Sequence, residues 1–408
     1  MATNKYNWTL CADVFTFWDK LKISKFLLTE RIWTYGKHIV AYEESWNKLI
    51  GHGVKTIMVS SGSTANELIA LRRKWELEQA GQWPRKNKVI FPVNTWVSSV
   101  TPWIHAGFEP VFVDVDPKNL NVYSYSLKEA FEKNVDNSIG TVFYTALLGF
   151  FGDLHECMMI TKSYGAKFLM DNCEASFSSI LRSNDPSKYD IPLVALATSS
   201  TSIFYSHFTT SGTEGGLIFT TDEEEYDWFR MMRSHGLTRG MPEKYKNPDV
   251  HPSFDFALLG SNYRSSNLQA YMASLDLQRA FEFSSKDRYA LFEAFYSVIS
   301  ESNKNIKMFG QADKYGYLGG EVIPLALPII FKSRDIRIKA EVFCKLNGVE
   351  TRPIIGGCLL AHNAFKKYGD VKDFPVAMNS HENGLYVGIH KNITKDMVIN
   401  LATDLSNL

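Results

Sequence analysis

The sequence SIFYSHFTTSGTEGG, residues 202–216, is the stretch that says most about the fold. Its apolar run Ile203-Phe204-Tyr205 predicts the buried end of a strand, and the Ser-Gly-Thr and Gly-Gly segments that follow predict turns. His207 lies between them. An imidazole after a buried run is more often a hydrogen-bonded core group than a catalyst. The stretch taken by itself therefore leaves both interpretations of His207 open.

The composition predicts an ordinary globular protein. The chain has 408 residues, of which 45% are hydrophobic and 22% are charged. Its 44 basic and 44 acidic residues cancel, which argues against nucleic acid or an anionic membrane as the main partner. The sequence contains neither a signal peptide nor an apolar run of the roughly 20 residues that a membrane span needs. We therefore expect a cytoplasmic protein with no nucleic-acid and no membrane partner.

The five cysteines are widely spaced and form no CxxC pair, so they predict reduced thiols instead of a disulfide framework or a metal site. They are Cys11, Cys157, Cys173, Cys344 and Cys358.

Short β-branched or aromatic runs alternate with helical stretches up to about residue 275, which predicts a mainly parallel α/β sheet. The expected strands are residues 56–59, 89–91, 110–115, 141–145, 167–170 and 217–220. One long helix is expected from Leu268 to about Phe281. The alternation is lost after about residue 285, where a helix at 335–346 ends at an Asn-Gly pair.

Two places in this pattern could bind an anion or a ligand. The small residues Ser60 to Thr64 follow a strand and precede a helix, so the helix N-terminus could hold a phosphate. An ordinary N-cap by Ser63 or Thr64 explains the same residues. Asp171 follows the strand at 167–170, and its place at the C-terminal end of that strand favours a ligand site over a turn.

The spacing around position 207 resembles the signature of the DegT/DnrJ/EryC1/StrS family of sugar aminotransferases, which are pyridoxal-phosphate enzymes. In that family a Ser lies five residues before the lysine that binds the cofactor, and an acidic residue with Gly-Gly follows seven residues after it. Ser202 and Glu214-Gly215-Gly216 match both spacings, whereas His207 replaces the lysine. The resemblance extends from Gly36 to about His390.

The resemblance implies a PLP-dependent transferase fold of type I, like that of aspartate aminotransferase. It implies a large, mainly parallel-sheet domain and a small α+β C-terminal domain. The expected divisions are an N-terminal helical segment (1–50), the cofactor-binding domain (51–280) and the small domain (281–408). A homodimer is also implied, because the family's Asn-aromatic-Arg element, Asn262 to Arg264 here, reaches the cofactor phosphate of the partner subunit.

The family's functional residues carry over to ten positions. Gly62 and Ser63 are expected at the cofactor phosphate, Trp96 on the pyridine ring and Asp171 at the pyridine nitrogen, where an anion keeps that nitrogen protonated. The cofactor-binding set also includes Glu174, Ser202 and Asn262, whereas His235 and Arg352 are expected on the substrate side and His207 is the expected catalyst.

Histidine at position 207 changes the implied chemistry. Imidazole cannot hold the cofactor aldehyde covalently as a lysine does, but it can move protons near neutral pH. One branch of the family, the nucleotide-sugar 3-dehydratases, has the same replacement and removes the C3 hydroxyl of a 4-keto-6-deoxyhexose in deoxysugar biosynthesis, including that of lipopolysaccharide O-antigens. The resemblance thus implies pyridoxamine phosphate as the working cofactor and L-glutamate as the amino donor. A related type needs a [2Fe–2S] cluster with four cysteine ligands, which the cysteine spacing does not provide.

Two other functions remain open from the sequence. A nucleotide-sugar aminotransferase would need a lysine near position 207, and none occurs between Lys188 and Lys244. A catalytically inactive homologue that only binds a nucleotide sugar could lose Asp171, Trp96 and Ser63, yet all three are present.

Overall fold

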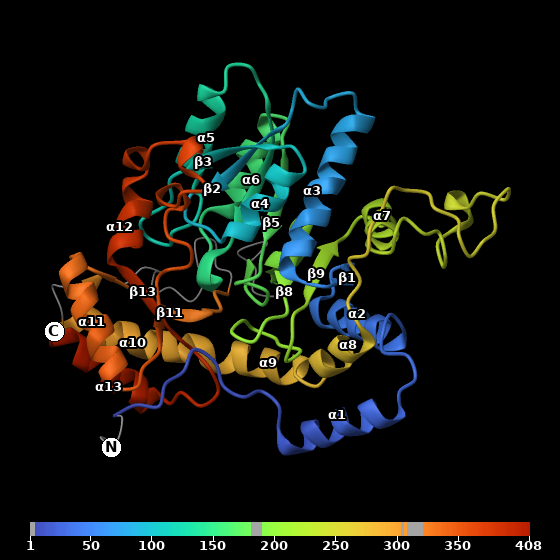
Figure 1. The fold of residues 1–408 in the computed structure, drawn as a ribbon. Coiled ribbons are helices and arrows are strands. Elements are labelled where there is room, and N and C mark those ends of the chain that lie inside the picture. The colour runs from blue at the N-terminus through green and yellow to red at the C-terminus, as the bar shows by residue number, and fades with distance from the viewer. Residues whose placement is uncertain (1–4, 181–189, 303–305, 308–320) are drawn as a thin grey trace.

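The computed structural model describes residues 5–180, 190–302, 306–307 and 321–408 (Figure 1). Parts of the three expected divisions, residues 1–4, 181–189, 303–305 and 308–320, lie outside the described residues. The centre of the molecule is a seven-stranded sheet in the order β1-β9-β8-β5-β4-β2-β3. Its strands are β1 (Lys55–Val59), β2 (Lys88–Pro92), β3 (Glu109–Val113), β4 (Ile139–Thr145), β5 (Lys167–Asp171), β8 (Ser199–Ser202) and β9 (Gly216–Thr220).

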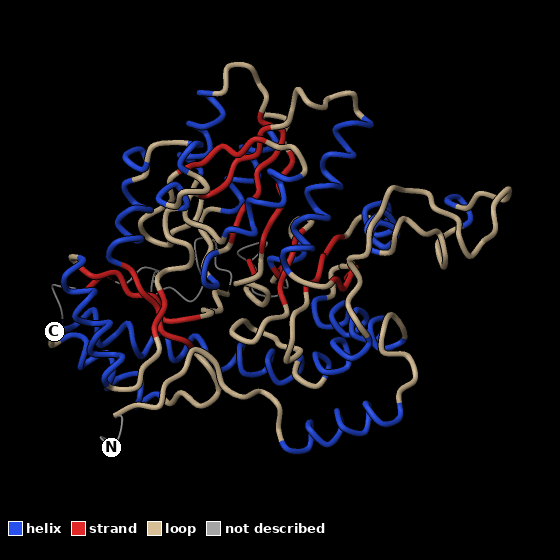
Figure 2. Tube along the Cα trace, in the orientation of Figure 1, coloured by secondary structure: helices blue, strands red, loops and turns tan. Residues whose placement is uncertain are grey.

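The sheet is mainly parallel, as the alternation of strands and helices predicts. The neighbouring strands from β3 to β8 pair in parallel, and only β9 and β1 are antiparallel to their neighbours. All seven residues of β4 are buried, as expected for a central strand that is covered on both faces. Figure 2 shows these strands together, with helices packed around them.

Helices accompany this sheet: the first four connect successive strands, and the last two follow β9. They are α3 (Gly62–Gln79), α4 (Val97–His105), α5 (Ser124–Lys133), α6 (Leu154–Ser163), α7 (Glu223–Arg233) and α8 (Asn267–Ser274). A small ladder, β6 (Ser179–Ile180) with β7 (Ile191–Pro192), lies outside the main sheet. After α7 the chain projects from the body of the molecule and returns before α8 (Figure 1). We call residues 236–261 the arm.

The N-terminal segment is only partly helical. Helices α1 (Phe17–Thr29) and α2 (Lys37–Ile50) are present, and Thr16 and Asp19 cap α1 reciprocally. Residues 5–15 form no helix, and the amide of Trp8 donates to the Gly348 carbonyl at 3.0 Å. Its indole donates to the Gly388 carbonyl at 2.8 Å. The start of the chain is therefore bound to the C-terminal part, which local sequence pattern cannot predict.

A second sheet forms near the C-terminus. Its antiparallel strands have the order β10-β11-β13-β12, with bounds β10 (Ile306–Lys307), β11 (Ala326–Phe331), β12 (Thr351–Arg352) and β13 (Gly384–Gly388). Helices α10 (Tyr289–Ser302), α11 (Arg334–Leu346), α12 (Pro375–Asn383) and α13 (Lys395–Ser406) accompany it. Placing the boundary of the small domain at residue 281 remains a proposal.

The connection between the two sheets is helical but not continuous. The prediction of one helix from Leu268 to about Phe281 is wrong, because α8 ends at Ser274 and α9 (Leu277–Phe283) begins after Asp276. A π-turn at Ser284–Arg288 then joins α9 to α10. The break places the Asp276 side chain where it accepts a hydrogen bond from the Thr210 amide, in the loop after His207. No helix in the described part of the chain is both long and apolar enough to cross a bilayer.

Candidate active site

A cavity of about 480 Å³ lies at the C-terminal ends of the central strands and reaches the second sheet. Its size is in the ordinary range for cofactor and small-ligand sites. Eight of the ten residues predicted from the sequence line it. They are Gly62, Ser63, Trp96, Asp171, Glu174, Ser202, His207 and Arg352. We call this space the site cavity. Asn262 and His235 do not line it.

Asp171 forms the floor of the site cavity. It is the last residue of β5, and its side chain is only 3% exposed. Its Oδ2 atom accepts from Asn66 Nδ2 at 2.9 Å and from Ser99 Oγ at 2.8 Å, and its Oδ1 atom accepts from the Cys173 amide at 3.0 Å. All three donors are neutral, so they hold the carboxylate in place without cancelling its charge. The floor can therefore pair with a cationic ring nitrogen.

The N-terminus of α3 forms one wall. The N-cap is Ser61, which exchanges hydrogen bonds with Thr64; the alternative of a cap by Ser63 or Thr64 is therefore wrong. Ser63 is left free to face the cavity. A Cβ atom at Gly62 would lie 2.9 Å from the Ser202 Cβ, so only glycine allows this close approach. First-turn amides have no partners within their helix, and with the Ser63 hydroxyl they provide donors for a phosphate.

Trp96 supplies an aromatic face. It precedes α4 and is 54% exposed, in contrast to Trp103 in the same helix, which is fully buried. A half-exposed indole on the wall of a cavity is available for stacking on a flat ring. This exposure argues against a purely structural role for Trp96.

Glu174 is buried beside the floor, three residues after Asp171. Its Oε2 atom accepts from the Leu148 amide at 2.7 Å. Burial raises the pKa of Glu174 to about 8, and the neighbouring Asp171 adds to this. Glu174 is therefore mainly protonated at neutral pH, so the site cavity carries less negative charge than its two carboxyl groups would suggest.

His207 lies in the loop that follows β8. Its Nδ1 atom is 2.5 Å from Ser202 Oγ, and its ring packs edge-on against Phe204 with centroids 5.4 Å apart. Burial lowers the pKa of His207 to about 4; Arg288 lowers it further, whereas Asp171 opposes the shift. The imidazole is therefore neutral near pH 7 and can accept a proton.

The same loop corrects one expectation. Strand β8 ends at Ser202; Ile203 is buried as expected, but Tyr205 is 49% exposed, so the predicted buried strand end does not extend over residues 203–205. The chain turns instead, and the His207 amide donates to the Phe204 carbonyl at 3.0 Å. This turn brings the imidazole back toward Ser202.

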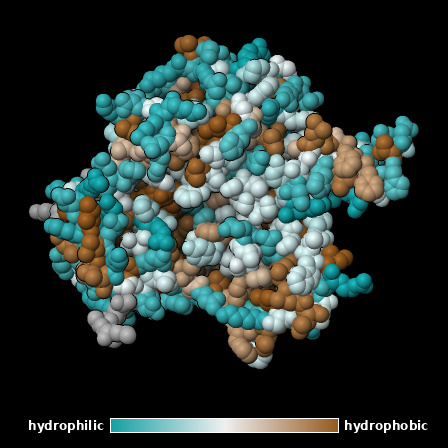
Figure 3. All heavy atoms as spheres, viewed as in Figure 1, coloured by the Kyte–Doolittle hydropathy of each residue, from teal (hydrophilic) through white to brown (hydrophobic). Residues whose placement is uncertain are grey.

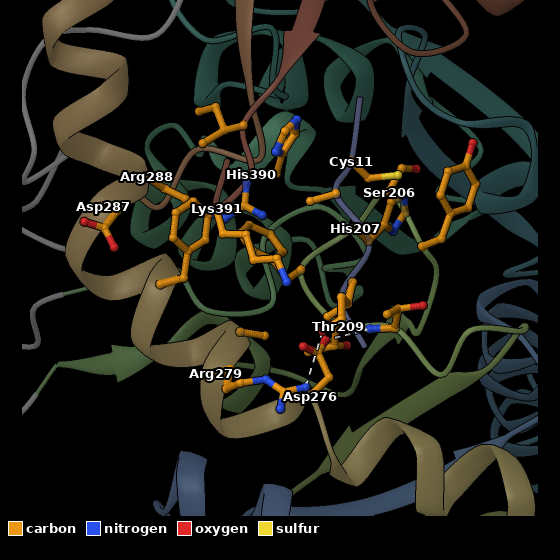
Figure 4. Close-up of a pocket in the computed structure, with 18 of the residues that line it drawn as sticks. Cys11, Ser206, His207, Thr209, Asp276, Arg279, Asp287, Arg288, His390 and Lys391 are labelled. Atoms are coloured by element: carbon orange, nitrogen blue, oxygen red, sulfur yellow. Dashed lines mark hydrogen bonds between the residues drawn. The ribbon is translucent and has the colours of Figure 1, made fainter. Parts of the chain in front are cut away.

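A second cavity, of about 430 Å³, lies behind His207 (Figure 4). We call it the rear cavity. Leu10, Tyr205, Ser206 and His207 line both it and the site cavity. Asp276, Arg279 and Arg288 from the helical connection lie across it from His207 and Ser206 (Figure 4). His207 thus separates two spaces of different character.

Asn262 and His235 lie together at the base of the arm. Both are exposed. Asn262 forms an isolated β-bridge with Ser234, the residue before His235. The His235 ring nitrogen Nε2 is 3.3 Å from Arg264 Nη2, and Asn262 Oδ1 accepts from the Arg264 amide at 3.3 Å. The structure of one chain therefore does not bring these two residues to the other eight.

Sequence reasoning missed the residues that support Asp171. Asn66 is fully buried within α3, and its Oδ1 also accepts from Ser200 Oγ at 2.5 Å. Ser99 lies three residues after Trp96. An asparagine on the buried face of a helix is a usable signal, but only the packing of α3 and α4 against β5 shows which carboxylate it serves.

These features fit pyridoxal or pyridoxamine phosphate. A flat ring with a protonatable nitrogen suits the Trp96 face and the Asp171 carboxylate, and its phosphate suits the α3 N-terminus. Gly62 keeps the wall close enough for that contact.

Comparisons with known proteins agree with this site. A model described as the DegT/DnrJ/EryC1/StrS aminotransferase family matches residues 19–406. GDP-4-keto-6-deoxy-D-mannose 3-dehydratase of Escherichia coli is 30% identical over 397 residues, which cover 92% of this chain and 94% of that protein.

Solved structures of such an enzyme are also similar. The E. coli enzyme with bound hydrated PLP superposes with a TM-score of 0.82 at 26% identity, covering 98% of this chain and 99% of that one. A GDP-4-keto-6-deoxymannose-3-dehydratase with a trapped PLP-glutamate adduct gives 0.81 at 25% identity, covering 98% and 100%. The predicted fold, a type I PLP-dependent transferase fold with a large mainly parallel sheet, is confirmed.

Proposed function

The chain belongs to the DegT/DnrJ/EryC1/StrS aminotransferase family, and on that premise we propose that it is a pyridoxamine-phosphate-dependent 3-dehydratase. Its substrate would be GDP-4-keto-6-deoxy-D-mannose, as the name of the similar E. coli enzyme states for that protein. The observation that carries the proposal is His207, which lies in the site cavity where the family has a lysine and is held by Ser202.

Four residues of this chain would bind the cofactor. The α3 N-terminus with Gly62 and Ser63 would hold its phosphate, Trp96 would cover one ring face, and Asp171 would keep the ring nitrogen protonated. When bound, the cofactor supplies an amino group for the sugar ketone and an electron sink. Because position 207 is not a lysine, the cofactor would be held without a covalent bond to the protein at that position.

His207 would move the protons of the reaction. As a neutral base it would take a proton from the C4′ carbon of the cofactor and deliver one to the departing C3 hydroxyl oxygen. Ser202 hydrogen-bonds the Nδ1 atom and so helps to orient the imidazole for this transfer. Arg352, at the edge of the site cavity, would contact the substrate.

L-glutamate would restore the amino form of the cofactor after each turnover. The amino group leaves as ammonia when the deoxygenated sugar is released, so an amino donor must replace it. The trapped PLP-glutamate adduct in the similar dehydratase supports this co-substrate.

A homodimer would complete the site. Asn262 and His235 are exposed and away from the site cavity of their own chain, so a second copy is needed to use them there. The arm exposes the apolar residues Phe254, Phe256 and Leu259. Apolar side chains of α1 also reach the surface at the lower edge of Figure 3. Light scattering should find a dimer; a fully active monomer would contradict this part.

The five free cysteines suit a reducing compartment, so we place the enzyme in the cytoplasm. Its product would serve deoxysugar biosynthesis.

The direct test is incubation of the purified protein with pyridoxamine phosphate, GDP-4-keto-6-deoxy-D-mannose and glutamate. We expect a 3-deoxy sugar nucleotide together with 2-oxoglutarate and ammonia. A 4-amino sugar as the product would instead indicate an aminotransferase. Cofactor binding with neither product would indicate an inactive homologue.

A further inference from the structure

A third cavity, of about 510 Å³, adjoins the site cavity. Trp96, Pro353 and Ile355 line both. Arg334 and Arg337, from the start of α11, also line the third cavity, as do His362 and His381. We call this space the basic cleft.

The cations of the basic cleft are poorly balanced by acids. Among the residues that the structure describes, Glu382 is the only acidic one that lines it. Arg337 pairs with Glu341 at 2.8 Å, but its buried Nε atom has no partner. The Arg334 side chain has no ion pair or hydrogen bond among the described residues.

Two histidines lie together in the basic cleft. Their ring centroids are 5.9 Å apart, and His362 Nε2 contacts the Gly356 carbonyl at 2.8 Å. Burial lowers the pKa of His381, and His362, Arg334 and Arg337 lower it further. The two arginines thus disfavour further positive charge in this hollow, and such a place favours a bound anion.

The backbone between the two cavities is held in an unusual conformation. Ile355 has a φ of 47°, which a β-branched residue rarely adopts. Gly357 has a φ of 61°, and a Cβ atom there would lie 2.2 Å from His381 Nδ1. The amide of Leu359 donates to the Val93 carbonyl at 2.9 Å and anchors this loop to the large sheet. Strain of this kind is often found at ligand sites.

The volume of the site cavity also favours an anionic ligand in the basic cleft. That cavity has to hold the cofactor and the reacting sugar, so the nucleotide needs adjoining space. The basic cleft is continuous with it beside Trp96. Guanidinium groups match phosphate oxygens with paired hydrogen bonds.

We propose that the basic cleft binds the diphosphate of the sugar nucleotide, through Arg334 and Arg337, while the sugar lies in the site cavity. This assignment rests on the proposed function, which supplies the nucleotide-linked substrate. The α11 N-terminus adds a favourable dipole, since Ser333 caps the helix there.

The test measures binding of GDP to the pyridoxamine-phosphate-loaded enzyme by calorimetry. We expect Arg334→Gln to weaken GDP binding by about tenfold, and the double variant with Arg337→Gln by more, because each loses a charge-assisted hydrogen bond. The salt dependence of binding should fall as well. The absorbance spectrum of the bound cofactor should not change, because neither arginine lines the site cavity.

Matched controls separate this effect from loss of charge or of fold. Lys339→Gln removes a cation from an exposed position of α11 outside the basic cleft, and it should bind GDP like the wild type. Guanosine, which lacks phosphates, should bind all variants equally. Arg334 is exposed and forms no ion pair with any residue that the structure describes, so the single variant should keep its thermal stability.

The outcomes are distinguishable. If the wild type binds GDP and both arginine variants bind it equally well, the assignment of the basic cleft is overturned while the proposed function stands. If the wild type does not bind GDP, the nucleotide-linked substrate is wrong and both proposals fail. If Lys339→Gln weakens binding as much as Arg334→Gln, the effect is one of net charge, and the cleft is not the site.

Discussion

The two faces of the loop that carries His207 are built differently. On the face toward the site cavity, small hydroxyl groups and neutral donors surround one carboxylate, Asp171. On the face toward the rear cavity, full charges are buried: Asp276 accepts from the Thr210 amide at 3.2 Å, and Arg288 lies 4.9 Å over the Phe208 ring. Both charged residues are about 95% or more buried.

The two faces of the loop therefore have different roles around the His207 imidazole. The front face leaves room and unpaired donors for a ligand to exchange. The rear face fixes the loop, because Arg288 also donates to the Leu325 carbonyl at 2.8 Å and so connects the loop to the second sheet. Burial lowers the pKa of Arg288 to about 9, yet it remains charged at neutral pH and disfavours protonation of His207.

The largest effect should come from the residue that both faces share. His207→Asn should lower dehydration roughly 10²–10⁴-fold, because the general base is lost, and should still bind cofactor through the front face. Steady-state assays measure the dehydration rate, and the absorbance of the cofactor measures its binding. Dehydration at the wild-type rate would refute the role of His207, as would mass spectrometry that finds the cofactor on a lysine of the reduced wild type.

Asp276, on the face toward the rear cavity, should affect how the stability of the protein depends on pH. Burial raises the pKa of Asp276 to about 6 from 3.8. Between these values the folded protein keeps a proton that the unfolded chain has lost, so this residue makes stability fall as pH rises from about 4 to 6, by up to about 3 kcal/mol. Asp276→Asn can still accept from Thr210 and should lack that decline.

Urea unfolding of both proteins across this pH range measures the difference. If the free energy of unfolding changes with pH equally in the two proteins, the pKa of Asp276 is not raised by folding. The contrast between the two faces would then depend on Arg288 alone.

Arg288, on the face toward the rear cavity, should affect the pKa of His207 without contacting its ring. Arg288→Met should raise the pKa of His207, because a repelling charge is removed. It should also reduce stability by about 1–3 kcal/mol, because the Pro324 and Leu325 carbonyls lose their donor. NMR of the ring protons measures the pKa of His207, and chemical denaturation measures the stability of the variant. An unchanged His207 titration would show that the rear face acts through packing only.

The smallest effect is expected on the front face, at the hydroxyl that orients the imidazole. Ser202→Ala removes the hydrogen bond to Nδ1, which contributes about 0.5–1.5 kcal/mol, so turnover should fall only about two- to tenfold. A fall in kcat with unchanged KM would indicate positioning of His207. A loss as large as that of His207→Asn would mean that Ser202 itself takes part in proton transfer.

The sequence by itself determined the parts that depend on local pattern. The alternation of strands and helices predicted the mainly parallel sheet, because a strand and a helix each show their period within one segment. The motif around His207 and the position of Asp171 at a strand end located the candidate site, because the ends of parallel strands meet at one edge.

Only the tertiary structure decided what surrounds those residues. Asn66 and Ser99 reach Asp171 from two helices, and Asp276 and Arg288 lie behind His207 about 70–80 residues further along the chain. The break between α8 and α9 and the attachment of Trp8 to the second sheet belong to the same class. Such contacts depend on how separate segments pack and on which buried charges find donors there, and neither has a period or a spacing in the sequence.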